Sequence, residues 1–511
     1  MSDLTRRGFS AALAAAAAPL NAQKPPDNGK PNIVFFVSDQ HDGRVMGCNG
    51  HPVVRTPNMD RLASMGVLFR NTYPGSAVCC PSRASLMTGR FPSDVGCYCN
   101  ATAFDGRYPT WGKRLQQAGY YTWATGKLDL CPDKDLGFVQ FDTEHGNFIE
   151  PDTTSLFRRP VGYRTGLAQH IKGGPRKKVH KDGRRVQSAL NWLETQPQKM
   201  QQPWVMYCGI EQPKAWESGA LQQFMEWYPP EKMPLPNIPP GHLENMHIAY
   251  RVMRSFSDIA FPIPDERVRE ARAAYYARVS EVDAHLGAML NMVEKTGHLK
   301  DTIFVYTSDH GEMLGEHGLW FKNELLEAAS RVPLIIAGPG IPRGRVVETP
   351  VAHVDLVAAL LDWGGAEIAR ELRGHSLRPL AMGVSGNHPG WAMTQANSQG
   401  CCTGSYMVRK GDWKYIYFSW YDNLLFNLRN DPDELNNLAG QPQYASIEKE
   451  LHTILTSQLD PDAVTREAFR EQDRRLQHLV KTQTAKEFYE YSAERFGKGE
   501  AAVLTDRFYR S

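Results

Sequence analysis

The sequence has almost no excess of charge of either sign. Its 511 residues carry 58 Lys and Arg against 56 Asp and Glu, which gives a formal net charge of +2. A protein that coats nucleic acid needs a strong positive excess, so the balance argues against that class. Affinity for an acidic substrate must therefore come from a local site. The length predicts two to four domains with ample chain for a large buried core.

A hydrophobic run long enough to cross a membrane is also missing. The Ala-rich run that ends at Leu20 is too short, because a bilayer takes roughly 20 apolar residues. It follows Arg6-Arg7, and twin arginines before such a run are typical of a twin-arginine export signal. We therefore expect residues 1–22 to be a signal peptide read by the twin-arginine translocase, and residues 23–30 to be an unstructured leader. The mature protein would be periplasmic or secreted, without a membrane span; an N-terminal helix of the fold is the alternative.

Cysteine is scarce and shows no metal-ribbon spacing. The chain has nine cysteines, an odd number, and Cys97-x-Cys99 lacks the spacing of a zinc ribbon. Neighbours such as Cys401 and Cys402 rarely bridge each other without strain. The sequence leaves disulfide pairing open.

No internal repeat is evident, but buried strands alternate with helices along the first three quarters of the chain. Short apolar runs predict strands at 32–38, 120–124, 203–209 and 302–307. Periodic stretches between them predict helices at 59–65, 110–118, 187–194 and 268–294. This alternation predicts an α/β fold with a large, mostly parallel sheet flanked by helices on both faces.

The pattern of apolar and polar residues changes near residue 386. Alternating apolar residues with turn residues between them predict antiparallel strands at 406–409, 413–418 and 424–428, followed by helices at 444–458 and 463–491. We therefore expect a catalytic domain over residues 31–385 and a smaller C-terminal antiparallel-sheet subdomain over residues 386–511.

Polar side chains follow all four predicted strands of the parallel sheet. Asp39 ends the first, Lys127 the second and Lys214 the third, and Asp309-His310 follow the fourth. Ligands gather at the carboxyl ends of parallel strands, so these residues are expected at one active site. A lone Asp at a strand end is usually a helix cap or an ion-pair partner. Asp39, Asp309 and His310 together instead indicate an oxygen-rich site for a divalent cation.

One stretch stands out among the rest, Cys79-Cys80-Pro81-Ser82-Arg83-Ala84-Ser85-Leu86-Met87-Thr88-Gly89-Arg90. Pro81 suits the first helical position, which predicts a helix from Pro81 to Met87. Its first-turn N–H groups would face an anion beside Cys79, and Arg83 would add a fixed positive charge. The plain alternative is a turn, a proline-started helix and a pair of inert buried thiols.

This stretch resembles the C-x-P-x-R signature of the type I sulfatases, which belong to the alkaline phosphatase superfamily. In that family the first Cys becomes a formylglycine, so the resemblance implies that a formylglycine-generating maturation enzyme converts Cys79 and that Arg83 steadies it. The hydrate of the aldehyde would attack the sulfur of a sulfate ester and later expel sulfate. The resemblance also implies that Asp39, Cys79, Asp309 and His310 hold one divalent cation, with Ca²⁺ expected.

The resemblance assigns roles to two lysines, and the sequence departs from the family pattern at several positions. Lys127 would contact a sulfate oxygen, and Lys322 would protonate the leaving oxygen. Gln40 stands where many relatives have a second acid, so either its amide or Asp42 would fill that role. His310 stands where many relatives have Asn, and an imidazole ligand suits Mn²⁺ better than Ca²⁺, with Mg²⁺ also open. Asp129 and Lys214 each stand where relatives have a His. Lys214 would either replace that His in substrate binding or be a loop lysine.

Further motifs narrow the resemblance to the arylsulfatase K branch, lysosomal sulfatases acting on 2-sulfated glucuronate. They are the stretches 38–44, 79–83, 126–129, 405–409 and 413–416. The branch implies a sulfated saccharide substrate, a 2-O-sulfated uronate above all, and a role in glycosaminoglycan degradation. It also places a substrate-binding histidine at His247, which is otherwise an unremarkable His in a Pro-rich loop.

Two other functions fit the same residues. A phosphonate or phosphate monoester hydrolase uses the same scaffold with a similar Asp-Gln and Asp-His pattern. A non-catalytic binder of sulfated glycans would explain the histidines replaced by Asp129 and Lys214. A binder would retain its ligand without releasing sulfate.

Overall fold

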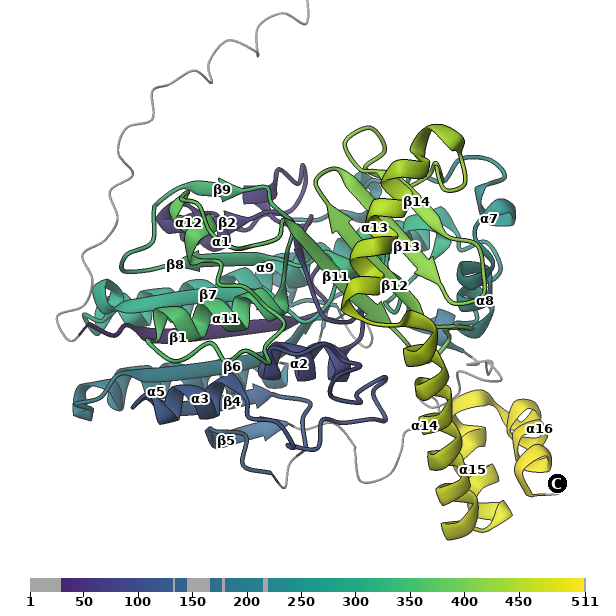
Figure 1. Cartoon of the computed structure of the whole chain (residues 1–511), viewed down its shortest axis with the longest axis horizontal. Coiled ribbons are helices and arrows are strands. Elements are labelled where there is room, and N and C mark those ends of the chain that lie inside the picture. The colour runs from purple at the N-terminus through teal and green to yellow at the C-terminus, as the bar shows by residue number, and fades with distance from the viewer. Residues whose placement is uncertain (1–28, 132–133, 145–165, 177–179, 215–218, 510–511) are drawn as a thin grey trace, which may run out of the picture.

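A computed structural model describes residues 29–131, 134–144, 166–176, 180–214 and 219–509. The expected signal peptide and most of the leader lie outside these residues. The large sheet in the centre of Figure 1 has eight strands in the order β5-β4-β6-β1-β7-β8-β2-β9. These strands are β1 (Asn32–Asp39), β2 (Gly66–Phe69), β4 (Tyr121–Lys127), β5 (Val139–Glu144), β6 (Trp204–Pro213), β7 (Thr302–Ser308), β8 (Leu334–Ala337) and β9 (Arg345–Val347).

The four strands predicted from apolar runs are neighbours in this sheet. They lie side by side as β4, β6, β1 and β7, and all three pairings among them are parallel. Only β8 runs against its neighbours, so the sheet is mostly parallel, as predicted. Parallel pairing brings the carboxyl ends of the four strands to one edge, where their polar residues meet.

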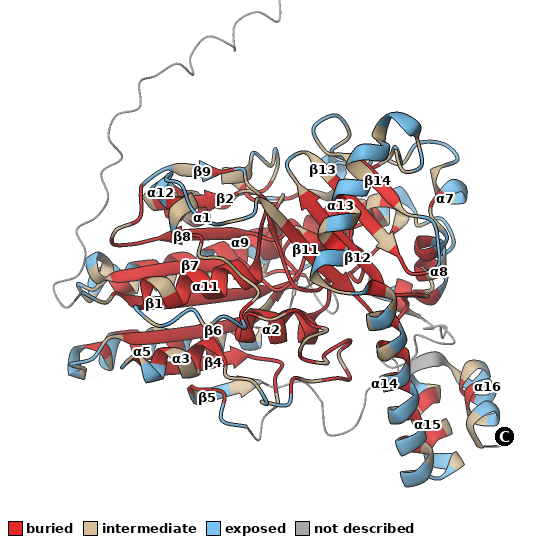
Figure 2. Ribbon diagram, in the orientation of Figure 1, coloured by how far each residue is buried: buried red, intermediate tan, exposed pale blue. Residues whose placement is uncertain are grey.

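Helices cover both faces of the sheet, because alternate residues of each buried strand point to opposite sides. Ile33, Phe35 and Val37 of β1 pack with α2 (Cys79–Thr88), α3 (Trp111–Gln117) and α11 (His353–Trp363). Val34 and Phe36 pack with α1 (Pro57–Met65), α5 (Lys181–Thr195) and α9 (Asp265–Lys295). Figure 2 shows the central strands buried along their length. The fold is therefore a three-layer α/β sandwich.

A second sheet lies beside the first and carries the C-terminal part of the chain (Figure 1). It is antiparallel, with β11 (Trp391–Ala396), β12 (Ser405–Lys410), β13 (Trp413–Phe418) and β14 (Leu424–Asn427) in sequence order. The helix α13 (Ala445–Gln458) packs against it through Leu451 and Leu455. This arrangement agrees with the antiparallel subdomain expected from the sequence.

The prediction of one continuous helix over residues 463–491 was wrong. The chain forms α14 (Pro461–Thr482) and α15 (Ala485–Phe496) instead, followed by α16 (Lys498–Tyr509). Thr484 caps α15 through the Glu487 N–H, and the Glu487 carboxylate accepts from the Thr484 N–H. This capping box starts a new helix after Gln483.

The remaining elements are short connections around the two sheets. They are β3 (Thr72–Tyr73), β10 (Val351–Ala352), α6 (Gln222–Met225), α7 (His242–Asn245), α8 (Ile248–Phe256), α10 (Glu327–Ser330), α12 (Arg378–Met382), and the 3-10 turns η1 (Gly47–Asn49), η2 (Leu167–His170), η3 (Pro197–Lys199), η4 (Pro230–Lys232), η5 (Leu299–Asp301), η6 (Glu316–Gly318) and η7 (Pro442–Tyr444). None of the helices within the described ranges could cross a membrane, because none combines the necessary length with the necessary apolar character.

Candidate active site

The helix that carries Cys79 begins at Cys79 itself, not at Pro81. Pro81 therefore occupies the third helical position, where its missing N–H costs no intrahelical hydrogen bond. The Cys80 N–H donates to Oδ1 of Asn100 at 3.1 Å, and the Ser82 N–H donates to the Val78 carbonyl at 3.1 Å. Because Pro81 has no N–H and the Cys80 N–H is already bonded, few of the expected free first-turn amides remain.

Four potential metal ligands meet at the sheet edge. Asp39, Cys79, Asp309 and His310 each offer one ligand atom, and these atoms all lie within 4.8 Å of one another. All four side chains are buried. Asp39 ends β1, Asp309 and His310 follow β7, and Cys79 begins α2, so three segments distant in sequence build the group. These are the residues that the sequence analysis brought together.

His310 faces this group in a defined tautomer. Its Nδ1 lies 2.9 Å from the Gly311 carbonyl oxygen, which can only accept, so Nδ1 carries the proton. Its Nε2 is left with a lone pair, 3.3 Å from Sγ of Cys79 and 3.4 Å from Oδ1 of Asp39. A backbone carbonyl holding the far nitrogen is the usual support for a metal-binding imidazole.

Two lysines converge on Cys79. Nζ of Lys322 lies 2.8 Å from Sγ, and Nζ of Lys127 lies 3.5 Å from Sγ. Lys127 also contacts the Asp39 carboxylate and, at 3.0 Å, Oδ2 of Asp129. Asp129 has a left-handed backbone with φ of 53°, an uncommon conformation for a non-glycine residue that recurs at functional sites. Asp129 thus balances the charge of Lys127.

The charges shift the acidity of the two central groups. Burial and Asp39 raise the pKa of the Cys79 thiol, but the ammonium groups of Lys127 and Lys322 oppose them, and this pKa is lowered to about 7. Burial likewise raises the pKa of Asp39, while Lys127, Lys322 and Lys214 hold it well below its usual range. The site therefore favours negative charge at position 79 and at Asp39.

Arg83 lies beneath the ligand group and is fully buried. Its Nε donates to Oδ2 of Asp309 at 2.8 Å, and its Nη1 donates to the Lys127 carbonyl at 2.9 Å and to the Tyr207 hydroxyl at 3.0 Å. Its hydrogen bonds within the described residues thus go to Asp309, to the Tyr207 hydroxyl and to backbone carbonyls at the strand ends, whereas the sequence analysis expected it to steady Cys79. Arg83 fixes a ligand carboxylate and the backbone beside Lys127.

Asp42 does not supply the second acid at the first strand end. Its carboxylate binds the Arg44 guanidinium two residues away, at 2.8–3.1 Å, and it is not part of the four-residue group. Gln40 remains the alternative. Its Nε2 donates to Glu312, while its Oε1 is buried and has no hydrogen-bond partner among the residues described. That amide oxygen is the unused acceptor next to Asp39.

Glu312 is a part of the site that the sequence analysis missed. Besides Gln40, its carboxylate accepts from the Leu314 N–H at 2.9 Å and the Phe321 N–H at 2.8 Å. Burial raises its pKa to about 7, against those hydrogen bonds. It orients Gln40 and holds the backbone just before Lys322. Its place three residues after Asp309, at the same strand end, was the signal that could have found it.

Lys214 and His247 lie apart from the contacts around Cys79. Lys214 follows β6 and a cis Gln212–Pro213 bond, and its carbonyl accepts from Arg278. Its charge reaches Asp39, as the pKa of that carboxyl shows. His247 precedes α8, accepts the Ala249 N–H at 3.2 Å and stacks on Phe418. It lines a hollow that has no lining residue in common with the four-residue group.

Comparison with known families finds one whose model matches more than half of the chain. The Sulfatase family profile matches residues 31–366, a range that contains all four ligand residues and both lysines. This chain belongs to the sulfatase family. A second profile, N-sulphoglucosamine sulphohydrolase, C-terminal, matches residues 315–460. The protein is thus a sulfatase, a hydrolase of sulfate esters, and its helices α14 to α16 begin just past the second match.

Curated relatives share most of the chain's length. Arylsulfatase K of Xenopus laevis is 30% identical over 461 residues, covering 84% of this chain and 83% of that protein. Choline-sulfatase of Rhizobium meliloti (strain 1021) is 32% identical over 448 residues, covering 81% and 83%. This sulfatase therefore resembles members with different substrates.

Solved structures show the same fold. A phosphonate monoester hydrolase of Agrobacterium radiobacter superimposes with a TM-score of 0.69 at 24% identity, covering 84% of this chain and 95% of that chain. A protein solved in complex with its substrate D-glucosamine-2-N,6-O-disulfate has a TM-score of 0.67 at 25% identity, covering 87% and 99%.

Proposed function

We propose that this sulfatase releases sulfate from sulfated saccharides, with residue 79 as the nucleophile and a 2-O-sulfated uronate as the substrate class. The observation that carries the proposal is the convergence of both lysines and the ligand group on the single side chain of Cys79. The saccharide class is supported by the motifs shared with arylsulfatase K and by the disulfated glucosamine that a structural neighbour binds.

The ligand group fits one divalent cation. Asp39 and Asp309 offer carboxylate oxygens, His310 offers Nε2, which would exchange its contact with Lys322 for the cation, and the side chain of residue 79 completes the set. The unpartnered Oε1 of Gln40, the residue after Asp39, would be a further hard ligand. When bound, the cation would neutralise negative charge on the sulfate ester and on residue 79. Oxygen donors favour Ca²⁺, and the imidazole keeps Mn²⁺ and Mg²⁺ as alternatives.

The surroundings of position 79 also suit an oxygen nucleophile. We propose that Cys79 is converted to formylglycine, whose hydrate would supply a hydroxyl in place of the thiol. The Lys322 ammonium, 2.8 Å from Sγ, would donate a hydrogen bond to such an oxygen. A site that lowers the thiol pKa to about 7 also stabilises a developing oxyanion at the same place.

Each of the other residues of the site has a separate proposed role. Lys322 is buried and keeps its proton, because Cys79 and Asp39 raise its pKa although burial lowers it, so it can protonate the leaving sugar oxygen. Lys127, held between Asp39 and Asp129, would contact a sulfate oxygen. Arg83 is a positioning residue that fixes Asp309 and the backbone of Lys127. Lys214 and His247 would contact the saccharide farther out.

We also propose an order of maturation. Residues 1–22 would direct export by the twin-arginine route to the periplasm or beyond, and this route carries folded chains. Cys79 is 2% exposed after folding, so the maturation enzyme would convert it in the cytoplasm before the chain folds.

A panel of esters tests the function. Sulfate release would be measured from a 2-O-sulfated uronate disaccharide, choline sulfate and 4-nitrophenyl sulfate, and phosphate or phosphonate release from the matching 4-nitrophenyl esters. We expect the disaccharide to have the highest kcat/KM. A preference for the phosphonate ester would favour the phosphonate hydrolase instead, and a preference for choline sulfate would overturn the saccharide class.

A further inference from the structure

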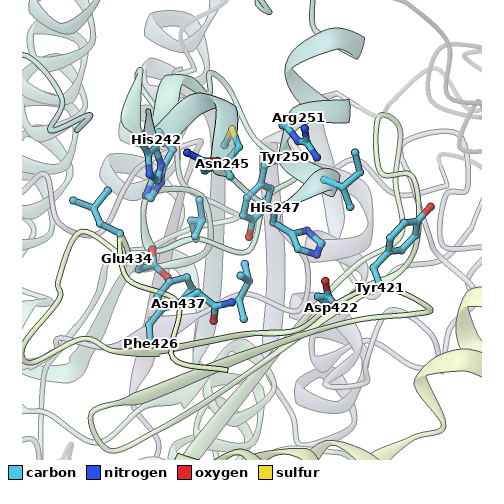
Figure 3. A pocket seen from close by; sticks show the side chains of 16 residues that line it. His242, Asn245, His247, Tyr250, Arg251, Tyr421, Asp422, Phe426, Glu434 and Asn437 are labelled. Carbon is cyan, nitrogen blue, oxygen red and sulfur yellow. The ribbon is translucent and has the colours of Figure 1, made fainter. Parts of the chain in front are cut away.

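The hollow that His247 lines is close in the chain to the segment that carries Lys322, because Leu326, four residues farther along, also lines it. Its volume is about 440 Å³, within the roughly 300–1,000 Å³ typical of small-ligand sites. Three parts of the chain form it: the α7–α8 region, η6 with Leu326, and the loops that precede and follow β14 (Figure 3). Neither the ligand residues nor the two lysines belong to its lining.

The walls of this hollow combine a flat aromatic ring with planar polar groups. Tyr421 is 44% exposed although it is a large aromatic residue, and it stands at the rim beside Asp422. His247, Arg251 and Asn437 also line the hollow, and in Figure 3 they surround the same space. An exposed ring that can stack on the C–H face of a sugar, with side chains that bond hydroxyls, is the composition that saccharide sites use.

The Tyr250 hydroxyl inside the hollow lacks a hydrogen-bond partner in the part of the chain that the structure describes. Tyr250 is 6% exposed and lines the hollow, and its hydroxyl makes no hydrogen bond with any described residue. A buried hydroxyl without a partner costs free energy, so a ligand or water must satisfy it. Its ring packs edge-on against Phe418, which also stacks on His247 at 4.1 Å between centroids. Two of the polar groups are therefore held in fixed orientations.

The position of the hollow relates it to the reaction. Leu326 lines it, and only about 14 Å of extended chain can separate Leu326 from Lys322. If Lys322 protonates the leaving oxygen, that oxygen and the sugar that carries it must lie within hydrogen-bond reach of Lys322. We propose that the hollow binds a sugar unit of the substrate beyond the sulfated one. This inference rests on the proposed function.

The hollow has no excess of charge of either sign, and this determines which chemical groups it can bind. Arg251 and Asp422 bring one charge of each sign, and Glu434 is already paired with Lys414 at 2.8 Å. The hollow therefore recognises ring and hydroxyl groups, while the sulfate is recognised at Cys79. It would distinguish an oligosaccharide from a short substrate.

Binding and turnover together test the inference. A 2-O-sulfated glycosaminoglycan hexasaccharide and its desulfated form would be titrated into Cys79→Ala chains, which cannot use residue 79 for hydrolysis. We expect Tyr421→Ala to weaken binding of both hexasaccharides by the same factor, roughly ten- to thirtyfold, as for loss of an aromatic anchor. Tyr250→Phe, which keeps the ring and removes the hydroxyl, should weaken both by a smaller factor. Trp420→Ala is the matched control, because Trp420 is 53% exposed in the same loop and does not line the hollow.

Turnover separates the two proposals. In chains with Cys79 intact, Tyr421→Ala should raise KM for the hexasaccharide and leave kcat/KM for 4-nitrophenyl sulfate unchanged. Hexasaccharide binding that is absent, or equal in Tyr421→Ala, Tyr250→Phe and the parent chain, would overturn the hollow as a sugar site. If the parent chain releases no sulfate from any ester but loses hexasaccharide affinity on Tyr421→Ala, the proposed function fails and the sugar site stands.

Discussion

Nζ of Lys322 lies 2.8 Å from Sγ of Cys79, and both side chains are almost fully buried. The same nitrogen lies 3.0 Å from Nε2 of His310, which has a lone pair to accept its hydrogen bond. The ammonium is therefore held between the proposed nucleophile and the imidazole of His310, a proposed metal ligand. This contact joins the proton donor to the rest of the site.

Replacing Lys322 should affect substrates according to their leaving group. Lys322→Met is expected to lower kcat/KM for a saccharide sulfate by about 10²–10⁴, the usual contribution of a general acid. The loss for 4-nitrophenyl sulfate should be much smaller, because nitrophenolate leaves without a proton. Steady-state kinetics on both substrates provide the measurement, with the exposed Lys300→Met as control. Equal losses on both substrates would show that Lys322 is not the proton donor.

Removing Arg83 should destabilise the fold. Its ion pair with Asp309 is fully buried on both sides, so Arg83→Met leaves a carboxylate without its partner and should lower the free energy of unfolding by about 3–5 kcal/mol. Arg83→Lys should recover little, because an ammonium cannot reach Asp309, Lys127 and Tyr207 together. Urea unfolding measures both variants.

An exposed pair of the same type is the control for Arg83. Arg429 pairs with Asp412 at 2.6 Å, but its side chain is 75% exposed, so Arg429→Met should cost less than about 1 kcal/mol. Comparable losses in Arg83→Met and Arg429→Met would contradict the structural role given to the buried pair.

Gln40 should contribute to metal affinity. If its unpartnered Oε1 serves the cation, Gln40→Ala should weaken Ca²⁺ binding by about 10–100-fold, as for other supporting groups of metal sites. Gln40→Glu, which restores an acid at this position, should retain or strengthen it. Calorimetric titration of Ca²⁺ and of Mn²⁺ into chelator-treated protein measures the affinity directly. Asp42→Asn is the control outside the group; an effect there but not at Gln40 would reverse the assignment.

Asp182 should make stability depend on pH in the acid range. It is fully buried, and although burial raises its pKa, hydrogen bonds and the charges of His180 and Arg185 lower it to about 2. A lowered carboxyl pKa stabilises the folded state above the unfolded pKa, and this contribution is lost as pH falls toward 2. The free-energy advantage of the wild-type chain over Asp182→Asn should therefore shrink by about 1 kcal/mol between pH 6 and pH 3. An advantage that is constant or grows on acidification would contradict the lowered pKa.

The sequence predicted correctly those strands whose local residue pattern reflects their place in the sheet. The runs that became β1, β4, β6 and β7 are apolar on both faces, and such strands belong in the middle of a parallel sheet. β2 and the edge strand β9 have only four and three residues, too few to show such a pattern, and they pair segments that lie far apart in the chain. The start of α2 was misplaced for a local reason: Pro81 is compatible with several positions of the first turn.

The arrangement of the site could likewise be predicted from the sequence only in part. Strand-end residues could be grouped because parallel strands end at one edge, and Asp39, Asp309 and His310 do meet there with Cys79. Side-chain partners could not be inferred. Asp42 turns to Arg44, which lies only two residues away, and Arg83 turns to Asp309 across a distance of more than two hundred residues. Such choices depend on which donors the packed fold brings near.

The state of side chain 79 tests the central claim most directly. Mass spectrometry of the proteolytic peptide spanning position 79, taken from active protein produced in cells that contain a maturation enzyme, should show the residue mass of an aldehyde or its hydrate in place of cysteine. A carbonyl-reactive hydrazide should label that peptide and not one carrying Cys79→Ala. Full activity in protein whose position 79 is entirely an unmodified thiol would contradict the account.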